Sequence, residues 1–216
     1  MRMVFVRFVL AVACAAVAGP AVTARQLGSR TADDWIKVLE SPERTSTLGI
    51  DHIIETLHLK SGDTVADIGA GTGIFSLPLA RAVAPAGKVY AVDVDPRLVE
   101  YIRTRAAVDK VANVQAVLGE FTDPKLPGQI DLGYFHDVLH HIANRPAYLA
   151  KLASYLKPGG RIAVVEMDPL KGSHRDDPTL QVSKAQLKGW MTSLGFTAQQ
   201  ELDLPGDRWM AVYGRK

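Results

Sequence analysis

Residues 65–73 constrain the fold of this chain more than any other segment, because three alternating glycines follow an apolar run that ends in an acid. The residues after them, 74–84, are predicted to form a helix. A glycine loop between a buried strand and a helix lets a ligand approach the backbone closely, and it points unpaired helix N–H groups at that ligand. The segment therefore predicts a ligand-binding loop.

The spacing of these glycines distinguishes between kinds of nucleotide-binding loop. A dinucleotide fingerprint needs a glycine where this chain has Ile74, and a phosphate loop ends in Gly-Lys-Ser/Thr where this chain has Gly-Ile-Phe. The pattern that fits, D-x-G-x-G-x-G, resembles motif I of the class I S-adenosylmethionine (SAM) dependent methyltransferases. This resemblance implies that four residues of the pattern bind SAM as the cofactor: Asp67, Gly69, Gly71 and Gly73.

Segments further along the chain extend the resemblance in the family's order. A second apolar run ends in Asp93, and an acid at this place can accept hydrogen bonds from both ribose hydroxyls. The resemblance implies that Glu120 contacts the adenine amino group and that Phe121 covers the adenine ring. It also places His136, at the tip of the fourth predicted strand, beside the methionine part of the cofactor.

Strands and helices alternate along most of the chain, which predicts a doubly wound α/β domain. The strands are nearly unbroken apolar runs, as in parallel sheets covered on both faces, and helical crossovers separate them. The resemblance implies a seven-stranded, mostly parallel, Rossmann-like sheet that ends in an antiparallel hairpin, and a small-molecule, methyltransferase type 11-like branch. We expect strands at 64–68, 88–93, 113–118, 130–135, 161–166, 196–204 and 208–213, and helices at 32–40, 47–58, 74–84, 96–107, 137–142, 146–156 and from 183.

The first residues have the pattern of a signal peptide. Arg2 and Arg7 precede a short apolar run, and residues 22–24 form an A-x-A-like cleavage site. We therefore expect three parts: a signal peptide at 1–24, an N-terminal helical lid segment at 25–60 and a SAM-binding domain at 61–216. Export to the periplasm follows; a misassigned start codon would instead make the protein cytoplasmic. The single cysteine, Cys14, lies inside the leader.

Composition limits the partners. The net charge is only +2 with no basic block, which gives no case for nucleic acid. The apolar run of the leader is too short to span a bilayer comfortably, so no stable membrane span is expected. With no appended domain, a small-molecule methyl acceptor is the expected partner; thiols, phenols and quinones are all compatible. The oligomeric state stays open.

The acceptor site is harder to predict than the cofactor site. Methyl transfer needs donor and acceptor in line and water kept out, and a base only if the acceptor starts protonated, so no catalytic residue is assigned. Two segments could roof the acceptor: residues 33–44, with Trp35 and Arg44, and the loop 167–179, with His174. Glu166 and Asp168, like Arg44, are speculative catalytic candidates.

Two other functions are alternatives to a small-molecule methyltransferase, and the histidines of residues 136–141 raise the question of a metal site. A non-catalytic SAM- or adenosyl-binding module of the cell envelope would keep motif I, whereas a nicotinamide oxidoreductase is disfavoured by Ile74. His136 and His140 would share a face of a continuous helix, but no third ligand has a familiar spacing, so no metal is expected.

Cell fractionation tests the export prediction. Because cleavage after Ala24 removes the leader, we expect an antibody to detect the shortened protein in the periplasmic fraction. Mature protein found only in the spheroplast cytosol would contradict export.

Overall fold

A single seven-stranded sheet organises the described part of the chain. The computed structural model describes residues 30–215, and the predicted signal peptide at 1–24 lies outside them. The strand order is β3-β2-β1-β4-β5-β7-β6, with β7 antiparallel to both β5 and β6. The strands are β1 (Thr64–Ile68), β2 (Lys88–Asp93), β3 (Val114–Leu118), β4 (Ile130–His136), β5 (Leu156–Met167), β6 (Thr197–Leu204) and β7 (Arg208–Gly214). The prediction of a mostly parallel sheet with a C-terminal hairpin is confirmed.

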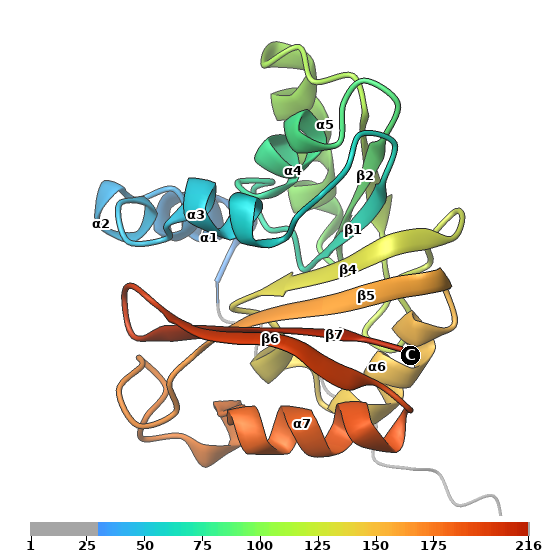
Figure 1. The fold of residues 1–216 in the computed structure, drawn as a ribbon. Helices are drawn as coiled ribbons and strands as arrows, with labels where there is room; N and C mark the ends of the chain where they lie inside the picture. Colours follow the sequence, from blue (N-terminus) through green and yellow to red (C-terminus); the bar gives the residue numbers. More distant parts are fainter. Residues whose placement is uncertain (1–29, 216) are drawn as a thin grey trace, which may run out of the picture.

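Helices cover both faces of the sheet (Figure 1). On one face α3 (Ile50–Thr56), α4 (Ser76–Ala82) and α5 (Pro96–Val108) pack, and on the other α6 (Arg145–Ala153) and α7 (Lys184–Ser193). Alternate residues of each central strand enter the two cores: in β1, Val65 joins the α3–α4 side and Ala66 the α6–α7 side. This alternation explains why the strands are apolar throughout.

The N-terminal segment folds as short helices whose ends are defined by capping. Thr31 begins α1 (Ala32–Leu39) with a capping box to Asp34. Ser41 caps α2 (Pro42–Thr45), and Gly49, in the left-handed conformation, precedes α3. The predicted single helix at 47–58 is therefore wrong in its first part, because the chain turns at Gly49 before α3 begins.

The structure corrects two further predictions: the helix expected after β4 and the start of the strand that follows α6. The expected helix at 137–142 is only a 3-10 turn, η2 (Leu139–His141), because Asp137 adopts a left-handed backbone with a φ of 52°. Strand β5 begins at Leu156 rather than at 161, since Leu156 pairs with Ile130 and an irregularity follows in the register. The loop after β5 contains a second 3-10 turn, η3 (Pro178–Leu180).

Side-chain contacts hold α1 and α2 over the carboxyl ends of the parallel strands. Glu40, at the end of α1, accepts hydrogen bonds from Arg105 (2.5 Å) and Tyr101 (3.0 Å) of α5. Arg44 of α2 lies 3.5 Å from Asp137, after β4. Among residues 30–215, no helix has the length and apolar character needed to cross a membrane.

Candidate cofactor and acceptor site

The glycine loop turns sharply between β1 and α4. Gly69, Gly71 and Gly73 all have positive φ angles, of 68°, 57° and 74°, which side chains other than glycine rarely adopt. The N–H of Gly73 donates to the Ala70 carbonyl at 2.8 Å, which closes the turn. The loop therefore exposes backbone, not side chains, at the carboxyl end of β1.

Space as well as conformation favours glycine at Gly69, whose neighbour is a stiff valine, whereas at Gly71 the neighbour is the flexible tip of a leucine and the backbone conformation is the main constraint. A Cβ on Gly69 would lie 2.2 Å from a methyl carbon of Val138, and one on Gly71 would lie 2.7 Å from Leu39 of α1. A Cβ on Gly73 would make only ordinary contacts, and Gly73 does not line the cavity described below. Gly73 thus shapes the turn, and its predicted contact with the cofactor stays a prediction.

Asp93 ties this loop to the end of β2. One carboxylate oxygen accepts the Gly71 N–H at 2.9 Å, and the other accepts the Asp95 N–H at 3.0 Å. The side chain is buried, and this burial raises the pKa of Asp93 above its ordinary value despite the backbone hydrogen bonds. Each carboxylate oxygen retains lone-pair capacity for a further donor such as a hydroxyl.

Asp67 lies beneath the loop at the end of β1. Its carboxylate accepts a hydrogen bond from the Ser76 hydroxyl at 2.6 Å, and the residue is buried. Burial raises the pKa of Asp67 to about 7, with a smaller contribution in the same direction from Asp93. The loop therefore sits above two buried carboxyl groups.

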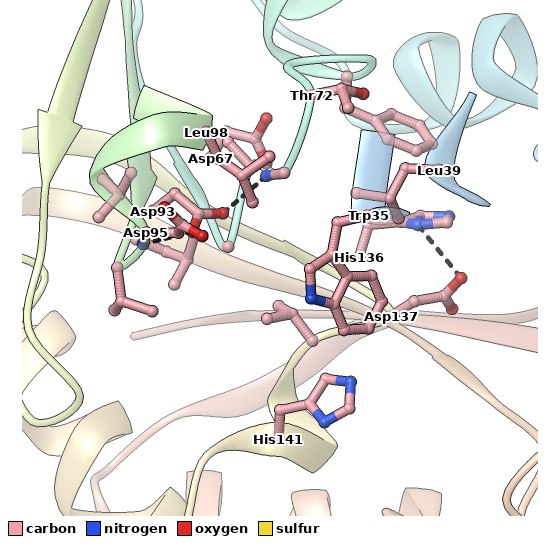
Figure 2. A pocket seen from close by; sticks show the side chains of 18 of the residues that line it. Trp35, Leu39, Asp67, Thr72, Asp93, Asp95, Leu98, His136, Asp137 and His141 are labelled. Carbon is pink, nitrogen blue, oxygen red and sulfur yellow. Dashed lines mark hydrogen bonds and ion pairs between the residues drawn. The ribbon is translucent and has the colours of Figure 1, made fainter. Parts of the chain in front are cut away.

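These residues line one cavity of about 620 Å³, a volume typical of small-molecule sites. Figure 2 shows Asp93 and Asp95 at one side of it and Trp35 and Leu39 of α1 at the other. Seven of the eight predicted cofactor residues line this cavity: Asp67, Gly69, Gly71, Asp93, Glu120, Phe121 and His136. The structure thus brings together residues from the ends of β1, β2 and β4 and from the segment after β3.

Glu120 and Phe121 occupy the exposed rim of the cavity. Glu120 is paired with Lys125 at 3.2 Å, and its side chain is 61% exposed. Phe121 is 43% exposed although it is a large apolar residue. An exposed aromatic ring beside a cavity is free to cover a planar ligand group.

His136 forms a buried part of the wall. Its ring lies 4.2 Å from the Phe75 ring, centre to centre, and neither ring nitrogen has a hydrogen-bond partner among the described residues. Burial lowers the pKa of His136 to about 4. Its Nδ1 lies 3.7 Å from Asp137, beyond hydrogen-bonding distance, so the ring presents two unpaired nitrogens at neutral pH.

A buried ion-pair cluster joins three elements beside this wall. Asp137 accepts hydrogen bonds from Arg208 of β7, the shortest at 2.8 Å, and Arg44 of α2 lies 3.5 Å away. Burial acts to raise the pKa of Asp137, but His136 and the two arginines outweigh it and hold that pKa below its ordinary value. Arg44 and Trp35 line the cavity, as the roof prediction proposed.

The other proposed roof residues lie elsewhere. Glu166 is buried against His140, and Asp168 and His174 line a second, much smaller cavity. None of these three residues lines the large cavity. Of the two proposed roof segments, residues 33–44 contribute to the lining of the large cavity and residues 167–179 do not.

Comparison with known proteins agrees with this geometry. The profile of the family described as "Methyltransferase domain" matches residues 59–206. This chain belongs to the SAM-dependent methyltransferase family. The demethylmenaquinone methyltransferase of Symbiobacterium thermophilum is 32% identical over 114 residues, which cover 50% of this chain and 44% of that protein.

Solved structures of methyltransferases share the fold of this chain. A SAM-dependent methyltransferase from Aquifex aeolicus superposes with a TM-score of 0.77 at 20% identity, covering 87% of this chain and 100% of that one. Magnesium protoporphyrin IX methyltransferase from Synechocystis, solved with S-adenosylhomocysteine, superposes with a TM-score of 0.72 at 18% identity. This match covers 89% of this chain and 97% of that one. The sequence matches to three curated relatives span only 38%, 44% and 56% of the length of those proteins.

Several residues of the candidate site could not be found by sequence reasoning. Thr72 is fully buried in the loop, with a hydroxyl that has no partner among the described residues. Asp137 and Arg208 are 71 positions apart, so no local spacing signals their pairing. The expected sharing of a helix face by His136 and His140 is wrong, since His136 ends a strand and His140 lies in η2.

Replacement of Asp93 tests the predicted ribose contact. We expect Asp93→Ala to weaken binding of S-adenosylhomocysteine by about 1–3 kcal/mol, because charge-assisted hydrogen bonds and the support of the Gly71 N–H are lost. Isothermal titration calorimetry measures this, with Glu100→Ala, on the exposed face of α5, as a matched control that keeps wild-type affinity. Wild-type affinity in Asp93→Ala would contradict the assignment.

The raised pKa of Asp67 predicts a pH-dependent stability. The folded protein keeps a proton on Asp67 up to about pH 7, whereas the unfolded chain releases it near 3.8, so stability falls as pH rises between these values. We expect the unfolding free energy of the wild type to fall by about 2–3 kcal/mol more than that of Asp67→Asn between about pH 5 and pH 8. Asn keeps an oxygen that accepts the Ser76 hydroxyl. Urea unfolding measures both free energies. Equal changes in the two proteins between these pH values would contradict a raised pKa of Asp67.

Proposed function

We propose that this protein transfers a methyl group from SAM to a small-molecule acceptor. The observation that carries the proposal is the single cavity in which the glycine loop, the carboxylate of Asp93 and the ring of His136 converge. It lies at the carboxyl ends of parallel strands, where open α/β sheets bind their ligands.

The residues of the cavity suit the parts of the cofactor. Asp93 offers carboxylate oxygens to a ribose diol, and Phe121 at the rim offers an apolar ring to the adenine. Asp67 and His136, at the other end, would face the methionine part. The bound cofactor supplies an electrophilic methyl group on a positively charged sulfur.

The protein's own contribution is position and exclusion of water. Leu39 of α1 lies against Gly71 of the glycine loop, Trp35 lines the same cavity, and the contacts of Glu40 with α5 hold α1 in place. In-line displacement at a methyl carbon gains most from such alignment. With a pKa near 4, His136 is a weak base at neutral pH, so we assign it a role in positioning rather than proton transfer.

The wall of the cavity away from Asp93 indicates the class of acceptor. It combines the apolar side chains of Trp35 and Ile142 with two cationic groups, those of Arg30, which lies over the Trp35 ring, and Arg44. Relatives and neighbours are named for demethylmenaquinone and for magnesium protoporphyrin IX. We infer a small, largely apolar acceptor with an oxygen or other electron-rich group.

A non-catalytic adenosyl-binding module is the second candidate, because the features that favour cofactor binding do not by themselves require transfer. Export, inferred from the leader, favours this candidate, because SAM is a cytosolic metabolite and an exported enzyme would need a supply of it. A nicotinamide oxidoreductase is disfavoured by Ile74, where the dinucleotide loop requires glycine.

Calorimetry followed by single-turnover transfer separates these functions. We expect S-adenosylhomocysteine to bind with one-to-one stoichiometry and NAD to give no heat of binding. We then expect methyl-labelled SAM to pass its label to a small-molecule acceptor pool. Tight binding without transfer would favour the adenosyl-binding module, and NAD binding would contradict the proposal.

A further inference from the structure

Three histidines from two separate segments meet beside the proposed methyltransferase site. His140 and His141 lie in η2, after β4, and His174 lies in the loop between β5 and η3. One ring nitrogen of each lies within 4.8 Å of the others. The ring centres are 4.1 Å apart for His140 and His141 and 4.9 Å for His140 and His174. Three nitrogen donors thus converge on one point.

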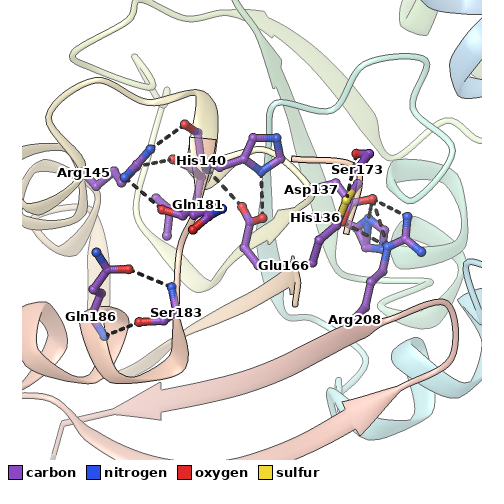
Figure 3. Close-up of polar contacts among 12 residues, drawn as sticks. His136, Asp137, His140, Arg145, Glu166, Ser173, Gln181, Ser183, Gln186 and Arg208 are labelled. Carbon is purple, nitrogen blue, oxygen red and sulfur yellow. Dashed lines mark hydrogen bonds and ion pairs between the residues drawn. The ribbon is translucent and has the colours of Figure 1, made fainter. Parts of the chain in front are cut away.

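The ring of His140 is oriented by a buried carboxylate. Its Nδ1 lies 2.7 Å from one oxygen of Glu166, and its backbone N–H donates to the other oxygen at 3.1 Å. Figure 3 shows both contacts. Both residues are 2% exposed. A carboxylate oxygen accepts, so the proton of His140 lies on Nδ1 and the Nε2 lone pair is free. Carboxylates hold the histidine ligands of metal sites in this same way.

The other two rings complete the cluster. The rings of His141 and His174 are both half-buried, and their centres lie 6.0 Å apart. The Nδ1 of His141 is buried and has no hydrogen-bond partner among residues 30–215. An orphaned buried nitrogen is costly unless a ligand satisfies it.

Arg145 holds the two segments of the cluster together. Its guanidinium donates to the carbonyls of Leu139 and His140 in η2, at 3.2 and 2.7 Å. It also donates to the carbonyls of Thr179 and Gln181, which follow His174, at 2.6 and 3.2 Å. The approach of His174 to η2 is thus supported by four hydrogen bonds from one side chain.

We propose that His140, His141 and His174 bind a divalent transition-metal ion, with zinc the best match, and that Glu166 positions His140. Three histidines that leave one position open form a common catalytic zinc site. Zinc–nitrogen bonds of about 2.0–2.1 Å place tetrahedral ligands roughly 3.3 Å apart. Nitrogens that lie up to 4.8 Å apart therefore need to approach one another by up to about 1.5 Å when the ion binds.

The histidine cluster borders the large cavity in which we propose that the acceptor binds. His141 lines the large cavity, whereas His140 and His174 line the small one, so the cluster lies at the boundary between them. The remaining coordination position suits water or an anionic donor such as a thiolate, phenolate or carboxylate. Metal binding does not depend on methyl transfer and can be measured by itself.

Zinc titration of the purified, untagged protein after removal of metals tests the proposal. We expect calorimetry with zinc chloride to show one ion per chain. His174→Ala removes a ligand from a partly exposed loop and should weaken binding at least about tenfold, and Glu166→Gln should weaken it by about 10–100-fold through loss of the orienting contact. His52→Ala, an exposed histidine on α3, is the matched control and should bind zinc within about twofold of wild type.

Two further measurements make the outcomes distinct. The visible spectrum of the cobalt-loaded protein should show tetrahedral coordination in the wild type and lose it in His174→Ala. S-adenosylhomocysteine should bind both proteins equally, which also shows that the variant is folded. If S-adenosylhomocysteine binds but zinc does not, or if His174→Ala binds zinc as the wild type does, the metal site is refuted and the proposed function still stands.

Discussion

The carboxylate of Asp93 joins the glycine loop to the end of the neighbouring strand, and the cavity is built around that contact. One oxygen holds the N–H of Gly71 and the other that of Asp95. Because the loop glycines have positive φ angles and no side chains, the bent backbone itself forms the wall. Burial raises the pKa of both Asp93 and Asp67, and a positively charged ligand bound beside these acids would lower both pKa values again.

The opposite wall depends on contacts between parts of the chain that are distant in sequence. Asp137 binds Arg208 from the last strand and approaches Arg44 from the N-terminal helices. Glu40 binds α5, which follows the strand that carries Asp93. The N-terminal helices therefore close a site whose floor is made by the central strands. Such closure would exclude water from the proposed methyl transfer, which gains from alignment of donor and acceptor.

The local signals of the sequence were enough for the sheet, and seven of the eight residues proposed to bind the cofactor line one cavity. Apolar runs separated by helical segments predicted the parallel strands, and the glycine spacing predicted the loop; the hydrogen bond from the Gly71 N–H to Asp93 appears only in the structure. Non-local contacts account for the errors. A helix after β4 was expected from residues 137–142 alone, but arginines from both ends of the chain meet Asp137, which has a left-handed backbone. The approach of His174 to His140 depends likewise on a distant loop supported by Arg145.

The most direct test of the site is an electron-density map from crystals grown with millimolar S-adenosylhomocysteine. The account predicts that the nucleoside lies in the large cavity, with its ribose hydroxyls on Asp93, its adenine beside Phe121 and its amino-acid part towards His136. A well-ordered map in which this cavity contains no nucleoside, or in which the ribose lies away from Asp93, would contradict the account.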